Sequence, residues 1–95
     1  MAVIFEWDPQ KAQTNLSTHR VSFEEAMTVF YDPLSIAIAD PLHSDQEDRF
    51  VIIGESLNRR VLVVVHTDRG DRIRLISARV ATPQERKRYE KGPTF

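Results

Sequence analysis

The spacing of hydrophobic residues changes several times along the chain, and each change predicts a new element of secondary structure. An apolar and aromatic run over residues 3–7 predicts a first strand. Asp8-Pro9 supplies a helix N-cap and a proline at the first helical position, which predicts a helix over residues 9–19. In that helix a narrow apolar stripe of Ala12 and Leu16, which we expect to be buried, runs beside a polar stripe of Lys11, Asn15 and His19.

Two further helices are predicted from their capping residues. Ser22 begins one of them, because Glu25 three residues later completes a capping box. Its core-facing residues have helical spacing: Phe23, Ala26, Met27 and Phe30. Asp32-Pro33 ends it, since the residue before a proline is disfavoured in helical geometry. Thr82-Pro83 with Glu85 predicts a final polar helix that stops at Gly92-Pro93, with Tyr89 as its one large apolar residue.

Between these helices the spacing predicts four strands. Alternating residues over 34–39 indicate a half-buried strand. Continuous apolar runs at 50–54 and 61–65 are typical of central strands covered on both faces, and a last strand covers residues 72–79. Strict alternation there places Arg72, Arg74, Ile76 and Ala78 on one face and Ile73, Leu75, Ser77 and Arg79 on the other.

The resulting order β-α-α-β-β-β-β-α predicts an α+β fold, an antiparallel meander with an N-terminal strand and a covering helical pair. Ninety-five residues correspond to a single domain, residues 1–95. No apolar run approaches the ~20 residues of a membrane span and no signal-peptide pattern opens the chain, so we expect no membrane partner and a cytoplasmic location. The absence of cysteine excludes disulfides, a thiol nucleophile and a cysteine-ligated zinc.

Charge changes this picture, because the net charge of -1 conceals a division of the chain. Residues 1–48 carry a net charge of -7 and residues 49–95 carry +6. Arginine outnumbers lysine ten to three, which favours bidentate recognition of phosphate. Seven arginines fall on the predicted strands and turns: Arg49, Arg59, Arg60, Arg69, Arg72, Arg74 and Arg79. This arrangement fits an RNA-binding sheet face, or alternatively a surface on which arginines pair with nearby carboxylates.

Histidine is the usual proton-transfer residue near neutral pH. His19 ends the first helix and is such a candidate, although a charge that only stabilises the helix C-terminus is the alternative. His43 lies among acidic residues that match no metal-ligand spacing, so neither a metal nor another cofactor is expected, and His66 is expected in the core. The chain contains no Ser-His-Asp order, GxSxG, P-loop or GxGxxG motif, so the residues alone do not name an activity.

Five groups of residues, in order and spread over residues 3–91, resemble the BrnT family of type II toxins. Each group is short, and the set as a whole is specific. They are Phe5-Glu6-Trp7-Asp8 with Lys11-Ala12 and Asn15-Leu16; His19 with Val21-Ser22-Phe23-Glu24-Glu25-Ala26; His43-Ser44 with Glu47-Asp48-Arg49-Phe50; Ile53-Gly54; and Ile76-Ser77-Ala78-Arg79 with Ala81-Thr82, Glu85-Arg86 and Tyr89-Glu90.

The resemblance implies a RelE-like fold and a ribonuclease that arrests growth by cutting RNA. It also implies a cognate BrnA-like antitoxin, a ribbon-helix-helix protein that neutralises the toxin and represses their shared operon. The toxin would then reach operator DNA only through the antitoxin. A toxin dimer within that complex is one arrangement the resemblance allows.

Metal-independent RNA cleavage requires removal of the 2′-OH proton, protonation of the leaving 5′-oxygen and stabilisation of the crowded phosphate. We assign the phosphate to Arg79, with Arg49 or Arg59 in support. His19 or Lys11 is the proton-transfer candidate, with Glu47 as an alternative base. The other residues expected to bind RNA are Arg60, Arg72, Arg74 and Ser77.

The chain departs from the family pattern at two positions. The family usually has a basic residue at position 18 and glycine at position 20, where this chain has Thr18 and Arg20. Without the glycine, the left-handed conformation that caps the helix after His19 is less favourable. Without the basic residue, the cluster of positive charge there is smaller. The alternative function is therefore a catalytically inactive toxin-fold module that acts as a co-repressor partner or as an RNA-binding domain.

Overall fold

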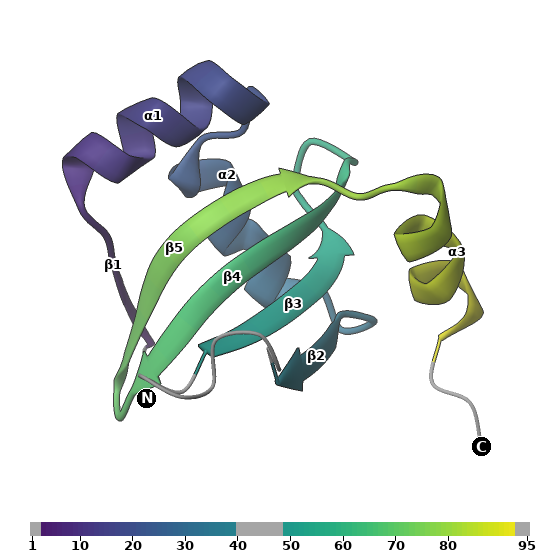
Figure 1. Ribbon diagram of the computed structural model, residues 1–95. Helices are drawn as coiled ribbons and strands as arrows, with labels where there is room; N and C mark the ends of the chain where they lie inside the picture. The colour runs from purple at the N-terminus through teal and green to yellow at the C-terminus, as the bar shows by residue number, and fades with distance from the viewer. Residues whose placement is uncertain (1–2, 40–48, 93–95) are drawn as a thin grey trace.

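The computed structural model describes residues 3–39 and 49–92, which fold into three α-helices, a 3₁₀ helix and a single sheet (Figure 1). The elements follow the predicted order. They are β1 (Ile4–Glu6), α1 (Pro9–His19), α2 (Phe23–Thr28), the 3₁₀ helix η1 (Val29–Tyr31), β2 (Ile36–Ala39), β3 (Arg49–Glu55), β4 (Val61–Arg69), β5 (Arg72–Val80) and α3 (Pro83–Lys91). Asp8, Ser22 and Thr82 cap α1, α2 and α3 with their side chains, as the sequence predicts.

The sheet is mixed, with strand order β1-β5-β4-β3-β2. Strands β2 to β5 pair antiparallel in sequence order, whereas β1 pairs in parallel with β5. The expectation of a wholly antiparallel sheet is therefore wrong at β1. Local pattern could not show this, because Ile4 pairs with Arg72 across most of the chain.

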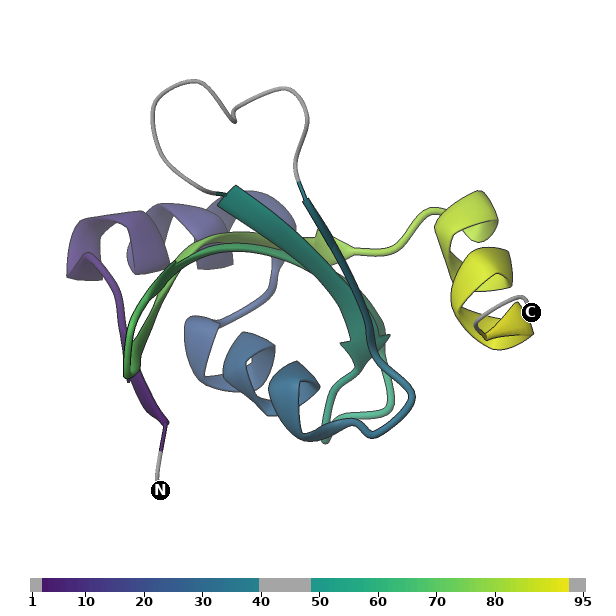
Figure 2. The ribbon, with the colours of Figure 1, turned by 90° about the horizontal axis from the view of Figure 1, so that it is seen from below.

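The main core fills the hollow of the curved sheet, where α2 and η1 lie (Figure 2). Phe23, Ala26 and Val29 are fully buried there against Leu62, Val64, Leu75 and Ala78 of β4 and β5. The helical stripe predicted from Phe23 is confirmed by this packing. Gly54 on β3 permits the close approach of η1, because a Cβ at this position would lie 2.9 Å from Val29 Cγ1.

Among the residues that the structure describes, the outer face of the sheet is covered only at the end near α3. Ile53, Val61 and Val63 form a small second cluster, and Tyr89 of α3 packs against it. Tyr89 is the apolar contact of α3, as predicted, and no residue of that helix is fully buried. The prediction that both faces of β3 and β4 are covered is thus met only at the end near α3.

A β-bulge in β5 overturns the predicted assignment of its faces. Val65 pairs with Ser77 and His66 pairs with Leu75, so Ile76 is an extra residue without a partner on β4. The bulge turns both Leu75 and Ala78 into the core. Ser77 and Arg79 consequently lie on the face opposite Leu75, instead of sharing it.

Helix α1 is held to the sheet by a polar side chain. The Asn15 amide donates to the carbonyl oxygens of Ala78 (2.8 Å) and Val21 (2.9 Å), and its Oδ1 accepts the Ala78 N–H at 3.0 Å. Asn15 is 6% exposed, whereas Leu16 is 50% exposed. The prediction that Leu16 belongs to the buried stripe is wrong. Asn15 faces the sheet instead, because the peptide groups at the edge of β5 require hydrogen-bond partners.

Arg20 ends α1 in the left-handed conformation, with φ of 59°. Its N–H donates to Leu16 at 2.9 Å, and its own carbonyl accepts a hydrogen bond from Arg60 Nη2 at 3.0 Å. The helix therefore keeps the cap geometry for which glycine is best suited, at a conformational cost of ~1 kcal/mol that glycine would not carry.

Replacement of Asn15 by alanine is expected to lower the free energy of unfolding by about 2–4 kcal/mol, because two carbonyls and one N–H lose their partner in a buried place. Chemical denaturation of the two proteins measures this difference. Gln13→Ala removes an exposed amide from the same helix and is the matched control, with an expected change within about 0.5 kcal/mol. Equal stabilities of the two variants would contradict the role given to Asn15.

Candidate functional site

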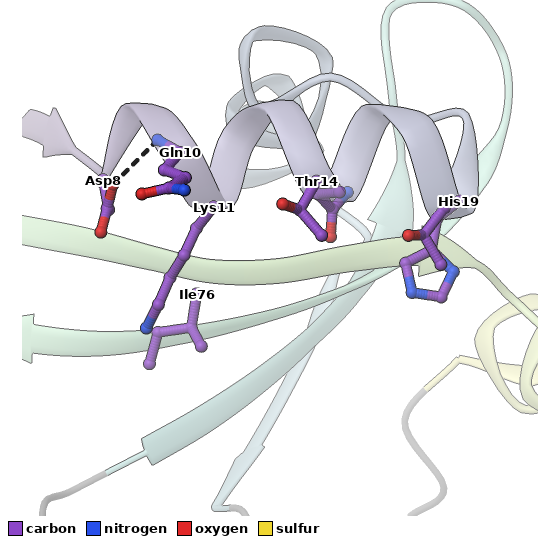
Figure 3. A pocket seen from close by; sticks show the side chains of 8 residues that line it. Asp8, Gln10, Lys11, Thr14, His19 and Ile76 are labelled. Atoms are coloured by element: carbon purple, nitrogen blue, oxygen red, sulfur yellow. Dashed lines mark hydrogen bonds between the residues drawn. The ribbon is translucent and has the colours of Figure 1, made fainter.

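A groove between α1 and β5 brings together two predicted catalytic residues, Lys11 and His19. We call it the α1 groove; its volume is about 510 Å³. Figure 3 shows the Lys11 and His19 side chains reaching from α1 across β5, with Ile76 beneath Lys11. The lining residues are Asp8, Gln10, Lys11, Thr14, Asn15, Thr18, His19 and Ile76.

The spacing of the polar stripe explains this arrangement. Lys11, Asn15 and His19 follow one another in steps of four, so they share one side of α1. Because Asn15 in the middle is fixed to Ala78, the two flanking side chains are held over β5. The groove offers an ammonium group, an imidazole and the hydroxyls of Thr14 and Thr18, a set that can bind and act on a phosphate ester. The spacing of Asn15 is visible in the sequence, but spacing alone does not predict its anchoring role.

A second groove lies on the outer face of the sheet, beneath α3. We call it the sheet groove; its volume is about 320 Å³. Ser77 and Arg79 of β5 line it, immediately after the bulge residue Ile76 of the α1 groove. Its lining residues are Ile38, Val51, Ile53, Val63, Val65, Ser77, Arg79, Glu85 and Arg88. Arg79, the predicted phosphate ligand, therefore lies next to the α1 groove along β5 and not within it.

Arg79 forms a bidentate ion pair with Glu85 of α3. Its Nη1 and Nη2 lie 2.7 and 2.9 Å from the two carboxylate oxygens. Hydrogen bonds from Arg79 hold the pKa of Glu85 at about 2, well below its usual range, and the same pair raises the pKa of Arg79. Glu85 also accepts the Thr82 N–H at 2.9 Å in the capping box, so a single carboxylate joins the start of α3 to β5.

A second polar contact fixes the other end of α3. The Tyr89 hydroxyl donates to Asp32 Oδ2 at 2.5 Å, and this oxygen also accepts the Glu55 N–H at 2.8 Å. Burial and the adjacent carboxylate raise the pKa of Tyr89 to about 12. The helix is thus attached by Glu85 and Tyr89 at positions four residues apart, and its other side chains are free to face solvent.

Three of the predicted RNA-binding arginines pair with carboxylates of distant segments. Arg72 and Arg74 lie 3.2 and 3.1 Å from the two oxygens of Glu6 on β1, and their hydrogen bonds lower the pKa of Glu6. Arg60 donates to Glu25 of α2 at 2.5 and 3.0 Å. The hydrogen bonds from Arg60 are the main cause of the lowered pKa of Glu25. These arginines hold β1 and the β3–β4 turn in place.

Arg59 and Arg49 line neither groove. Arg59 is exposed in the β3–β4 turn with φ of 64°, and Arg49 begins β3 opposite Thr67. Glu47 and His43 lie outside the described residues. His66 is buried, as predicted, against the rings of Phe30 and Phe50.

A search of residues 3–39 and 49–92 finds no three His, Asp or Glu side chains placed to hold a metal ion. None of the helices in these ranges has the length and apolar character needed to cross a membrane.

Comparison with known proteins extends these observations. Residues 7–85 match the family model described as "Ribonuclease toxin, BrnT, of type II toxin-antitoxin system". The structure is similar to the crystal structure of the Brucella abortus ribonuclease toxin BrnT, with a TM-score of 0.60 and 27% sequence identity. The similarity covers 86% of this chain and 97% of that chain. No curated protein matches the sequence.

Acid is expected to remove the stabilising effect of the Arg79–Glu85 pair. Because the pKa of Glu85 is lowered in the folded state to about 2, the pair stabilises the protein above the ordinary carboxyl pKa of 4.5, and the effect is lost as pH falls toward 2. The difference in unfolding free energy between the wild type and Glu85→Gln should be constant above about pH 5 and shrink below it. Denaturation at a series of pH values measures it.

Glu90→Gln is the matched control for this prediction, because Glu90 is exposed on the same helix. A difference between wild type and Glu85→Gln that does not change with pH would show that Arg79 does not select the ionised form of Glu85.

Proposed function

Because the chain belongs to the BrnT family of ribonuclease toxins of type II toxin–antitoxin systems, we propose that it arrests growth by cleaving RNA in the α1 groove. The observation that carries this proposal is that Lys11 and His19 both line one groove, on a helix fixed by Asn15. Both residues were candidates for proton transfer on sequence grounds.

The proposed reaction needs no group beyond those of the chain and the RNA. His19 removes the 2′-OH proton, the 2′-oxygen attacks phosphorus, and the bond to the 5′-oxygen breaks, leaving a 2′,3′-cyclic phosphate and a 5′-hydroxyl. Lys11 stabilises the charge that develops on the phosphate, and either it or the protonated His19 donates a proton to the 5′-oxygen. Thr14 and Thr18 supply neutral donors for other phosphate oxygens.

Arg79 is proposed to hold a neighbouring phosphate of the same strand. It lies on β5 three residues after Ile76, and Glu85 engages its two terminal nitrogens. Nη1 also donates to the Val80 carbonyl at 3.5 Å, which leaves the Nε–H and the second hydrogen of Nη2 for a further acceptor. Arg49 and Arg59 remain predicted backbone contacts on more distant parts of the surface.

The partners are proposed from the same membership. An antitoxin of the BrnA-like ribbon-helix-helix type would neutralise the toxin and carry it to operator DNA, so that the complex represses its own operon. The toxin would meet its RNA in the cytoplasm. A specific observation also favours the alternative of an inactive co-repressor module: the α1 groove contains Thr18, where the family usually has a basic residue.

His19→Ala is expected to lower the rate of RNA cleavage by about 10²–10⁴-fold, because proton transfer to and from the ribose oxygens is lost. Lys11→Ala is expected to lower it by about 10²-fold through loss of charge stabilisation. Single-turnover cleavage of a labelled RNA by the purified toxin measures both, and induction in cells should show relief of growth arrest.

Lys87→Ala removes an exposed lysine from α3 and is the matched control, with an unchanged rate expected. Cleavage that persists in both groove variants would place the reaction elsewhere. A wild-type protein that binds RNA or the antitoxin without cutting RNA would instead support the binding-module alternative.

Thr18→Lys is expected to strengthen RNA binding and to steepen its dependence on salt, because the groove gains one cation. For single-stranded RNA, one added phosphate contact changes the slope of log K against log salt by about 0.7. Fluorescence anisotropy over a salt series measures the slope. Ser17→Lys adds the same charge to the neighbouring exposed position outside the groove, and an equal effect of the two substitutions would indicate non-specific attraction.

A further inference from the structure

The outer face of β3 and β4 is aliphatic, yet α3 covers only its end. Ile53 and Val63 are buried there beside Tyr89, whereas Val51 and Val65 remain half-buried beyond it. Val51 and Val65 pair directly in the sheet, so their side chains form a continuous floor for the sheet groove. Sheet faces turned to solvent normally alternate with polar residues, and an apolar floor of this kind marks a surface that another molecule covers.

The rim of the sheet groove is cationic. Arg79 and Arg88 lie on it, and Glu85, the one carboxylate among the described residues of the lining, pairs with Arg79. Arg88 is exposed and makes no ion pair with any residue in the described ranges. An occupant that fits this groove therefore combines an apolar surface with at least one negative charge placed near Arg88.

The side chains of the floor favour a peptide over a nucleic acid as the occupant of the sheet groove. Within residues 3–39 and 49–92, no aromatic side chain lines the groove, so this part of the chain offers bases no ring on which to stack. Aliphatic side chains of a peptide pack well on valine and isoleucine, and a carboxylate on the same peptide can pair with an arginine.

We propose that the sheet groove is the docking site of the antitoxin, which inserts a segment with aliphatic side chains on Val51 and Val65 and an acidic side chain on Arg88. The identity of the occupant rests on the proposed function, since a toxin of this class has an antitoxin. The docked segment covers Ser77 and Arg79 and stands beside Ile76 of the α1 groove. It thus neutralises the toxin by obstructing the path of RNA across β5, without touching Lys11 or His19.

The test compares two readouts for four variants. The first is the affinity for the antitoxin encoded beside the toxin gene, purified after co-expression with the toxin; the second is RNA cleavage by the free toxin. Arg88→Glu is expected to weaken antitoxin binding at least tenfold, because it places like charges together. Arg86→Glu makes the same change on α3 outside the groove and should leave the affinity within about threefold of wild type.

The floor is tested with a nearly isosteric change that preserves strand propensity. Val51→Thr buries a hydroxyl against the docked segment and is expected to weaken antitoxin binding by about tenfold. Val80→Thr, at an exposed end of β5, is the control and should bind as wild type does. All four variants should cleave RNA at the wild-type rate when the antitoxin is absent.

Equal antitoxin affinities of Arg88→Glu and Arg86→Glu would overturn the proposal, as would wild-type affinity of Val51→Thr. Loss of RNA cleavage in Arg88→Glu would show that Arg88 serves RNA, as Arg79 is proposed to do, and not the antitoxin, and would also overturn the proposal. A wild-type toxin that does not cleave RNA contradicts the proposed activity alone, because the antitoxin affinities are measured separately.

Discussion

The amide of Asn15 makes the contact on which the rest of the structure depends. Strand β1 pairs only with the first three residues of β5, so no other described strand pairs with the second half of β5 on this side. Asn15 supplies both a donor and an acceptor to Ala78 and thereby takes the place of a neighbouring strand. By the same contact it orients α1, and the orientation of α1 determines where Lys11 and His19 lie.

Patterns among neighbouring residues were sufficient to predict the helices and strands, but they were insufficient to predict how the strands pair at the edge of the sheet. The order of helices and strands could be predicted because its signals lie within a few neighbouring residues. Examples are the capping residues Ser22 and Thr82 and the helical stripe that begins at Phe23. The parallel partner of β1 and the bulge at Ile76 depend on pairing between segments far apart in the chain. No local periodicity records such pairing, and the faces of β5 were therefore assigned wrongly after Ile76.

The candidate site divides in the same way. Lys11 and His19 could be predicted to act together because a helix brings residues at steps of four to one side. The partners of the arginines could not, since Glu6 and Glu25 come from the acidic half of the chain and meet Arg72, Arg74 and Arg60 only in the folded state. The acidic half and the basic half of the chain therefore partly neutralise each other within the folded protein. Arg88 is a cation that takes no part in these pairs.

The long range of the Asn15 contact has a consequence for synthesis of the protein. Asn15 and Ala78 are 63 residues apart, so a nascent chain carries α1 long before the ribosome has translated β5. Until then the α1 groove has only one of its two walls. While the ribosome is still translating β4, the nascent chain therefore carries no complete α1 groove. The groove forms only after β5 has been translated and can fold against α1.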